Sequence, residues 1–450
     1  MINGRKQRNE LTVSPNYTLA PDATFNHAVV IGGGIAGFTA ARVLSDHFAH
    51  VTVVERDHLP DAPVRRHGVP QARHAHNLLP EGQKILEALF PGLVDELLAR
   101  GAVAMREGEQ ALFIAGREQE WPRRGLDVWI AASRPLLETA IYRRVDVHPR
   151  IHVLQGYEAT GLSVSEDGRR VSGVLLRSRD SAHPTRTELA AELVVDASGR
   201  RSKATHWLAG LGYAPPSETT VDAFAGYASR IYRRPDGFEG TWKALYVRPH
   251  RRTGTRGGII IPLEGNRWHV TLIGMARDYP PTDEEAFLAF ARSLPTAELY
   301  EAIKEAEPLT KPFGYRSTGN RLRHYEALPD YLEGFLMTGD AVYTMNPVYA
   351  QGMTLAAIAA QTLQQVLEAQ RMRTDLTGLA ERFQKELWQA VAGQWRQATM
   401  EDRRWPGTVV LDGERPDGGR ARSGPAAGAR FPVRVPSWQP AAASVRPRAR

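Results

Sequence analysis

Cysteine is absent from this chain of 450 residues. Its absence excludes disulfide bonds, metal sites built on thiolates, and redox chemistry that depends on a thiol. Long apolar runs are also missing, and no stretch approaches the roughly twenty residues that a helix needs to cross a bilayer. Residues 1–26 are polar and lack the apolar block of a signal peptide. We therefore expect a cytoplasmic protein without a transmembrane segment.

Acidic residues are scarce near the C-terminus, and this shortage accounts for most of the net charge of +7. From Pro406 onward eight arginines accompany three acidic residues, so this end carries +5 and the remaining chain +2. The segment is rich in Pro, Gly and Ala and has few large aliphatic side chains. We interpret residues 406–450 as a disordered basic tail and residues 1–26 as a flexible arm. Because the excess charge lies outside the body, we expect no nucleic-acid partner.

Glycine, in contrast, forms a motif near the start of the chain. Residues 28–31 are a short apolar run typical of a buried parallel strand. Gly32, Gly34 and Gly37 follow it with the spacing G-x-G-x-x-G. The first glycine permits a tight turn, the second lets the backbone approach a pyrophosphate, and the third lets the next helix pack closely. Since the helix N-terminus offers N–H groups to phosphates, the motif predicts a dinucleotide site.

A second strand is predicted at residues 51–55 and ends in Glu55. Glu55 comes about twenty residues after the glycines, where its carboxylate can accept hydrogen bonds from both hydroxyls of a ribose. A carboxylate at this point also disfavours a phosphate on that ribose, which argues against NADP. Arg56, directly after it, is a further candidate cofactor-binding residue.

Two later segments distinguish FAD from NAD. Residues 193–196 are an apolar strand that ends in Asp196 and opens the pattern Asp-x-x-Gly-x-x-Ser. Another apolar strand ends in Gly339 and Asp340, and the Asp340 carboxylate could bind a ribityl hydroxyl. Sites at both ends of the sequence that bind parts of one long dinucleotide indicate FAD, and therefore an enzyme.

A long helix is predicted just beyond, over residues 353–370. Pro347 and Gly352 flank the turn that leads into it, and Met353 is its first residue. The helix N-terminus can direct backbone N–H groups at the pyrimidine edge of the flavin and stabilise its anionic reduced form. These three residues are therefore candidate cofactor-binding positions.

The stretch from residue 221 to 274 has a different pattern, with short runs that alternate between polar and apolar residues. This alternation predicts antiparallel strands that form a lobe over the flavin. Tyr227 and Trp268 in this stretch, and Tyr343 beyond it, are candidate substrate-binding aromatics. Packing in the core would explain each of them as well.

The three motifs, in this order and spacing, resemble those of class A flavin-dependent monooxygenases, which have the para-hydroxybenzoate hydroxylase fold. Residues 69–76, 89–92 and 346–349 resemble, more narrowly, the flavin-dependent epoxidases of polyether antibiotic biosynthesis. The similarity extends from about residue 28 to about residue 404. It implies an α/β architecture in which a Rossmann-like FAD-binding lobe carries a smaller antiparallel-sheet (α+β) substrate lobe.

The resemblance and the local patterns together predict the domain organisation. The FAD-binding lobe comprises residues 27–215, with a helical insertion near 80–125, and residues 311–405, which include the C-terminal helices. The antiparallel substrate lobe comprises residues 216–310. In this family the chain usually continues as ordered structure where the basic tail begins here.

Three further residues are candidates near the flavin. Arg134 matches the Ser-Arg start of a helix in the family, which implies a contact near the phosphates; a solvated helix start is the alternative. His74 and His76 lie one residue apart on an expected loop. Hydrogen bonding beside the flavin and simple loop packing both explain them. A metal site is disfavoured, because no convincing third ligand completes it.

The resemblance implies a monooxygenase that holds FAD non-covalently and transfers one oxygen atom from a flavin C4a-hydroperoxide to a small organic molecule. Epoxidation or hydroxylation of a polyketide or terpenoid-type secondary metabolite is expected. O2 is the co-substrate, and NADPH or NADH supplies electrons directly or through a flavin reductase. No residue stands out as a catalytic base. The alternatives are a flavin dehydrogenase or prenyl-chain reductase, and a non-enzymatic dinucleotide-binding interaction protein; a halogenase is disfavoured because no Trp-x-Trp-x-x-Pro signature occurs.

Overall fold

The computed structural model describes residues 24–106, 109–115, 118–120, 128–180, 186–371, 373 and 375–413. Within them, the longer helices are formed where apolar residues recur at helical spacing. The helices are α1 (Ile35–Leu44), α2 (Pro80–Leu89), α3 (Leu93–Ala99), α4 (Arg134–Asp146), α5 (Ala204–Gly210), α6 (Glu284–Arg292), α7 (Glu298–Ile303), α8 (Gly352–Gln370) and α9 (Leu379–Asp402). Short 3-10 turns that matter below are η1 (Pro70–Arg73), η2 (Gly199–Arg201), η4 (Gly339–Ala341) and η5 (Pro347–Tyr349).

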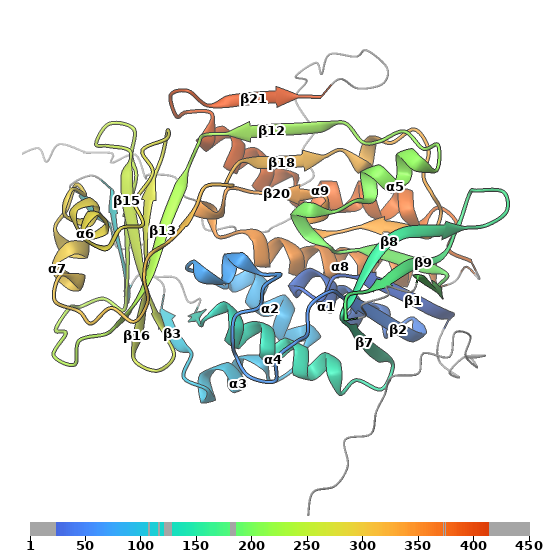
Figure 1. Ribbon diagram of the computed structural model, residues 1–450, viewed down its shortest axis with the longest axis horizontal. Coiled ribbons are helices and arrows are strands. Elements are labelled where there is room, and N and C mark those ends of the chain that lie inside the picture. Colours follow the sequence, from blue (N-terminus) through green and yellow to red (C-terminus); the bar gives the residue numbers. More distant parts are fainter. Residues whose placement is uncertain are drawn as a thin grey trace, which may run out of the picture. The chain divides into compact units, whose positions relative to one another are not determined.

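A five-stranded parallel sheet forms the centre of one lobe (Figure 1). Its strands, in spatial order, are β19 (Phe335–Met337), β11 (Leu193–Asp196), β1 (Phe25–Ile31), β2 (Phe48–Glu55) and β7 (Ile151–Gln155). The strands are rich in apolar residues because both faces of the sheet are covered. Helix α1 packs on β1 and β2 and against α8, while a three-stranded antiparallel sheet contacts β2 and β11. That sheet is β10 (Arg186–Ala190), β9 (Val171–Ser178) and β8 (Tyr157–Val164).

A seven-stranded sheet forms the second lobe, and α6 and α7 pack beside it (Figure 1). Its strands, in spatial order, are β17 (Phe313–Tyr315), β13 (Gly226–Arg233), β16 (Arg267–Gly274), β15 (Arg256–Leu263), β14 (Ala244–Arg248), β4 (Ala111–Ala115) and β5 (Glu118–Glu120). All neighbours are antiparallel except β14 and β4, which pair in parallel. The fold class is therefore confirmed: a Rossmann-like α/β lobe carries a second, antiparallel lobe.

Two smaller sheets complete the structure. The first is β20 (Tyr343–Thr344), β18 (Asn320–Arg323), β12 (Glu218–Asp222) and β21 (Val409–Asp412); the second is β3 (Val103–Arg106) and β6 (Val128–Ala131). Within the described part of the chain, no helix is long and apolar enough to cross a membrane.

Four predicted boundaries require correction. The insertion near 80–125 is helical only as far as Ala99; β3, β4 and β5 follow, and β4 joins the substrate sheet because its apolar run pairs with β14. β12 lies inside the predicted substrate lobe but pairs with β18 and β21 instead.

The predicted tail begins too early, because Val409–Asp412 forms β21 along the edge of β12. Residues 414–450 lie outside the described residues. The predicted arm ends before residue 26, since β1 begins at Phe25.

Candidate functional site

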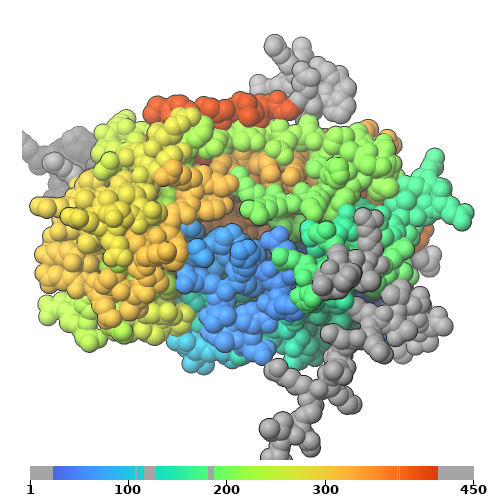
Figure 2. All heavy atoms as spheres, in the orientation of Figure 1, coloured from blue at the N-terminus to red at the C-terminus, as the bar shows by residue number. Residues whose placement is uncertain are grey.

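Three segments from distant parts of the sequence meet at one edge of the parallel sheet. β1, β11 and β19 are neighbours, so their carboxyl ends place α1, η2 and η4 together. A Cβ atom on Gly339 would lie 2.8 Å from the Cβ of Ala36, and one on Gly199 would lie 4.0 Å from the Cβ of Asp340. The opening glycines and the late aspartate are therefore adjacent. Figure 2 shows a hollow between the blue and green segments, with orange atoms on its floor.

The glycine turn is packed on one side and open on the other. Gly32 has a φ of +105°, and a Cβ on Gly37 would lie 1.8 Å from the carbonyl oxygen of Gly32. Gly34 is the N-cap of α1, and no atom lies within 4 Å of the position of its missing Cβ. No side chain caps the helix, so its first N–H groups remain free to bind an anion. This geometry fits a pyrophosphate.

Glu55 is buried at the end of β2 and belongs to a row of side chains in which acids and arginines alternate. Its Oε2 accepts a hydrogen bond from the Gly33 amide at 2.6 Å and lies 3.5 Å from Nη1 of Arg66. Arg66 also donates to the Gly33 carbonyl (2.8 Å) and, through Nε, to Glu138 (3.2 Å). Glu138 in turn accepts from Arg134 at 2.7 Å. The acid thus fixes the turn, and its binding of a ribose stays a prediction.

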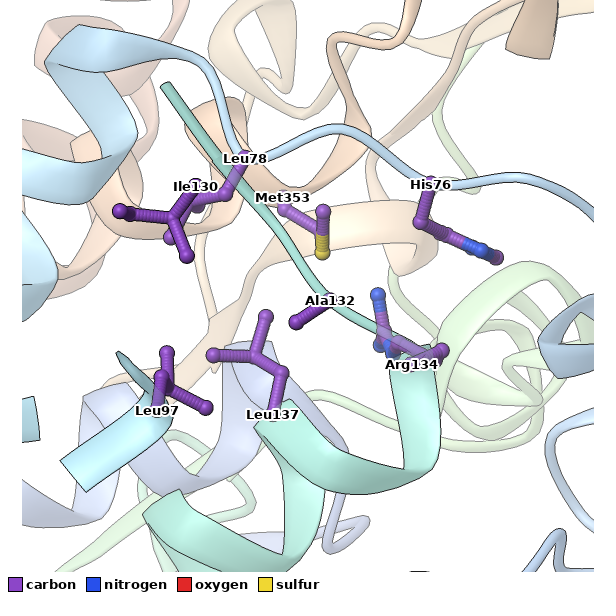
Figure 3. A pocket seen from close by; sticks show the side chains of 8 residues that line it. All are labelled: His76, Leu78, Leu97, Ile130, Ala132, Arg134, Leu137 and Met353. Atoms are coloured by element: carbon purple, nitrogen blue, oxygen red, sulfur yellow. The ribbon is translucent and has the colours of Figure 1, made fainter. Parts of the chain in front are cut away.

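Arg134 begins α4, where the hydroxyl of Ser133 accepts a hydrogen bond from the Leu136 amide. Its side chain lines a small cavity together with His76 and Met353, whose sulfur points into it (Figure 3). The remaining lining is aliphatic: Leu78, Leu97, Ile130, Ala132 and Leu137. The fold therefore brings two predicted residues, Arg134 and Met353, together.

His76 is held in one tautomer beside Arg134. Its Nδ1 lies 2.9 Å from the carbonyl oxygen of His74, so Nδ1 donates and Nε2 remains an acceptor. Burial, assisted by the nearby Arg134 cation, lowers the pKa of His76 to about 3. Burial also lowers the pKa of His74 to about 4, and its Nδ1 lies 2.8 Å from Oγ of Ser229. No group of three His, Cys, Asp or Glu suited to a metal occurs among the described residues.

The two predicted aspartates face different surroundings. Asp196 is fully buried and accepts from the Ser198 amide (2.9 Å) and the Ser202 hydroxyl (2.5 Å). It therefore holds the turn into η2, and its contact with a cofactor stays a prediction. Asp340 is exposed, yet desolvation by the surrounding protein raises its pKa against the effect of Arg134 and other arginines. An accessible carboxylate is suited to hydrogen bonding with hydroxyl groups, and binding of the ribityl chain by Asp340 stays a prediction.

The turn before α8 is anchored by a buried polar network that the sequence did not reveal. Pro347 and Gly352 are exposed, whereas Asn346 is buried and donates from Nδ2 to both carboxylate oxygens of Asp402 at 3.1 and 3.2 Å. Asp402 also accepts from Tyr349 (2.6 Å) and from Asn320 (2.6 Å). Burial raises the pKa of Asp402 despite these bonds.

The three predicted substrate-binding aromatics are all buried. Tyr227 is beside the turn, since its hydroxyl donates to Oδ1 of Asn346 at 2.7 Å. Trp268 packs against Trp242 and Phe238 in the core of the second lobe, and Tyr343 donates to the Leu355 carbonyl at 3.0 Å. These contacts give Trp268 and Tyr343 packing roles, and binding of substrate by them stays a prediction. Arg56 is exposed at the rim of an open surface concavity.

Sequence reasoning missed Glu138 and Asp402. Glu138 lies four residues after Arg134, a spacing that indicates a helical ion pair and could have been noticed. Asp402 ends α9 and contacts residues more than fifty positions away. No local pattern distinguishes it from a surface acid.

Comparison with known proteins agrees with this geometry. A family model described as "FAD binding domain" matches residues 26–381, more than half of the chain. The chain belongs to the FAD-binding-domain family. Protein Rv3254 of Mycobacterium tuberculosis is 35% identical over 360 residues, which cover 78% of this chain and 75% of that protein. This member of the FAD-binding-domain family is therefore a FAD-dependent oxidoreductase, and FAD is its cofactor.

Solved structures share the fold of this family member. The flavin-dependent brominase Bmp2 aligns with a TM-score of 0.62 and 16% identity, covering 84% of this chain and 87% of that one. PqsL of Pseudomonas aeruginosa, described as a probable FAD-dependent monooxygenase, aligns with a TM-score of 0.55 and 18% identity, covering 85% and 93%. At these identities the likeness concerns the fold alone.

Proposed function

We propose that the protein is a FAD-dependent monooxygenase that inserts one oxygen atom into a small organic substrate, by epoxidation or hydroxylation. The observation that carries the proposal is the meeting of the glycine turn with Asp340 at the carboxyl ends of β1, β11 and β19. The strings that resemble polyether epoxidases favour an alkene of a polyketide or terpenoid-type metabolite. We propose O2 as co-substrate and NADPH or NADH as electron donor, used directly or through a flavin reductase.

The residues of this chain would bind and shield the cofactor. The free N–H groups of α1 would hold the pyrophosphate, Glu55 the ribose, and Asp340 the ribityl chain. Bound FAD would supply the oxygen-activating redox chemistry. Met345, Pro347 and Val348 follow Asp340 and would help to exclude water. Lobes of residues 27–215 with 311–405, and of 216–310, remain the proposed division, with β4, β5 and β17 moved to the second lobe and β12 and β21 assigned to the first.

Two measurements test the proposal. Purified protein should show the visible spectrum of bound FAD, and NADPH or NADH with O2 should yield products heavier by one oxygen atom across a panel of alkenes and electron-rich arenes. A colourless protein that gains no FAD on reconstitution would refute the cofactor site. Anaerobic turnover with an alternative electron acceptor, without oxygenated product, would favour the reductase instead.

A further inference from the structure

Two arginines share one aromatic ring at the boundary between the lobes. The guanidinium carbon of Arg73 lies 4.6 Å from the centroid of the Phe313 ring, and that of Arg65 lies 5.4 Å from it. Both arginines are exposed, and both come from the segment between β2 and α2, which Figure 1 shows in blue beside the second lobe. A guanidinium stacked on a ring keeps its N–H edge free, and that edge matches a carboxylate or phosphate.

Nothing in the described part of the chain neutralises this pair. Neither Arg65 nor Arg73 makes an ion pair there, whereas Arg66 between them is paired with Glu55 and Glu138. Like charges held on one ring repel each other unless an anion lies between them. Burial lowers the pKa of the neighbouring His74 and His269 to about 4, and smaller contributions of Arg73 to His74 and of Arg65 to His269 lower it further. Both histidines are therefore neutral near pH 7, and the two arginines carry the positive charge beside Phe313.

An apolar wall adjoins the pair on the same face of the sheet. Phe313 and Tyr315 alternate on β17, so their side chains project from one face about 7 Å apart. The ring of Tyr315 lies 5.4 Å from that of His74 and packs against the cluster that contains Tyr227, Met275 and Val348. Val348 belongs to the turn that precedes α8. The wall thus extends from the arginine pair towards the proposed flavin site.

We propose that Arg65 and Arg73, stacked on Phe313, bind the acidic end of the substrate, a carboxylate or phosphate, while its apolar part lies along the Tyr315 wall. The site selects an amphiphilic organic acid. This inference rests on the proposed function, since it places the apolar part of that acid towards the flavin.

Calorimetric titration of the FAD-loaded protein with decanoate, decyl phosphate and decanol tests the site. We expect at least one acid to bind roughly tenfold or more tightly than decanol, because a charge-assisted pair of hydrogen bonds is worth at least that factor. Arg65→Gln and Arg73→Gln should each remove most of this preference and leave decanol binding unchanged. The matched control is Arg292→Gln, an exposed arginine that stacks on Tyr300 in the same lobe.

The titration distinguishes an absent anion site from a failure of the proposed function, on which the anion site rests. Equal binding of acids and decanol, or an acid preference that survives both glutamine variants, would overturn the site. If the variants weaken NADPH binding and leave decanoate binding intact, the arginines serve the electron donor and the substrate assignment is wrong. The visible spectrum is recorded before any ligand is added, so a failure to hold FAD is recognised separately as a failure of the proposed function.

Discussion

At the residue scale, Gly34 and Gly37 serve the same turn for different reasons. A Cβ on Gly37 would collide with the Gly32 carbonyl, whereas one on Gly34 would meet no protein atom within 4 Å. Gly34→Ala should therefore fold normally, but its methyl group would obstruct a pyrophosphate at the start of α1. We expect FAD affinity, measured by fluorescence titration, to fall on the order of tenfold, or about 1.4 kcal/mol.

Gly393→Ala is the matched control, because Gly393 is exposed on α9 and its missing Cβ also faces open space. It should leave FAD affinity unchanged and stabilise the helix by up to about 1 kcal/mol. Wild-type affinity in Gly34→Ala would show that the phosphates do not lie at this helix.

A buried histidine makes stability depend on pH. His269 lies against the loop, with Nε2 3.0 Å from the Arg73 carbonyl, and burial lowers its pKa to about 4. An unfolded histidine titrates near pH 6.5. Folding therefore favours the neutral form of His269. Its contribution to the free energy of unfolding is complete above about pH 6.5 and is lost as the pH falls towards 4. The loss is about 2 kcal/mol at pH 5.

His269→Gln keeps an N–H donor for the Arg73 carbonyl but does not titrate. Its thermal midpoint should therefore fall less than that of the wild type between pH 7 and pH 5. The lowered pKa values of His74 and His76 also make the protein less stable as the pH falls. The raised pKa values of Asp340 and Asp402 make it more stable as the pH falls. These groups are present in both proteins, so the difference in slope isolates His269. Exposed His206→Gln serves as control, and parallel slopes for His269→Gln and wild type would contradict the prediction.

At the element scale, the turn before α8 depends on the end of α9. Asp402 accepts hydrogen bonds from Asn346, Asn320 and Tyr349, and its removal would leave buried donors without partners. We expect Asp402→Ala to lose about 3 kcal/mol or more of unfolding free energy. FAD affinity should fall with it, because the turn leads directly into α8. Glu401→Ala, at the half-exposed neighbour of Asp402, removes only an ion pair with exposed Arg404 and should change both quantities little. Chemical denaturation and FAD titration measure them.

Strand β21 lies at one edge of the small sheet. β21 pairs with β12 from Thr219↔Asp412 to Asp222↔Val409, and the hydroxyl of Thr408 donates to the Asp402 carbonyl at 2.7 Å. Truncation after Gly413 should therefore preserve the thermal midpoint. Truncation after Trp405 removes β21 and exposes the edge of β12, and it should lower the midpoint by several degrees. Equal midpoints for the two truncations would mean that β21 contributes no stability.

At the scale of the whole molecule, the sequence predicted the local elements and the meeting of the glycine turn with Asp340, and it missed other contacts between distant segments. The glycine turn, the strand ending in Glu55 and the long helix after Gly352 each follow from neighbouring residues, and the structure contains all three elements. The pairing of β4 with β14 and the anchoring of Asn346 by Asp402 join residues far apart. The spacing of apolar residues along the sequence does not indicate such contacts, because packing decides how distant segments pair.

The cofactor itself should stabilise the assembled fold, since α1, η2 and η4 come from three distant parts of the chain and meet at the carboxyl ends of neighbouring strands. A ligand that binds only the folded state adds about 2.7 kcal/mol at one hundred times its dissociation constant. We expect FAD to raise the thermal midpoint of apoprotein by several degrees, and FMN to raise it less because FMN lacks the adenosine that Glu55 would hold. Asp340→Ala should reduce the shift produced by both flavins, since they share the ribityl chain. If FMN stabilised the protein as much as FAD, the glycine turn and Glu55 would have no part in binding, and the cofactor would have to lie elsewhere.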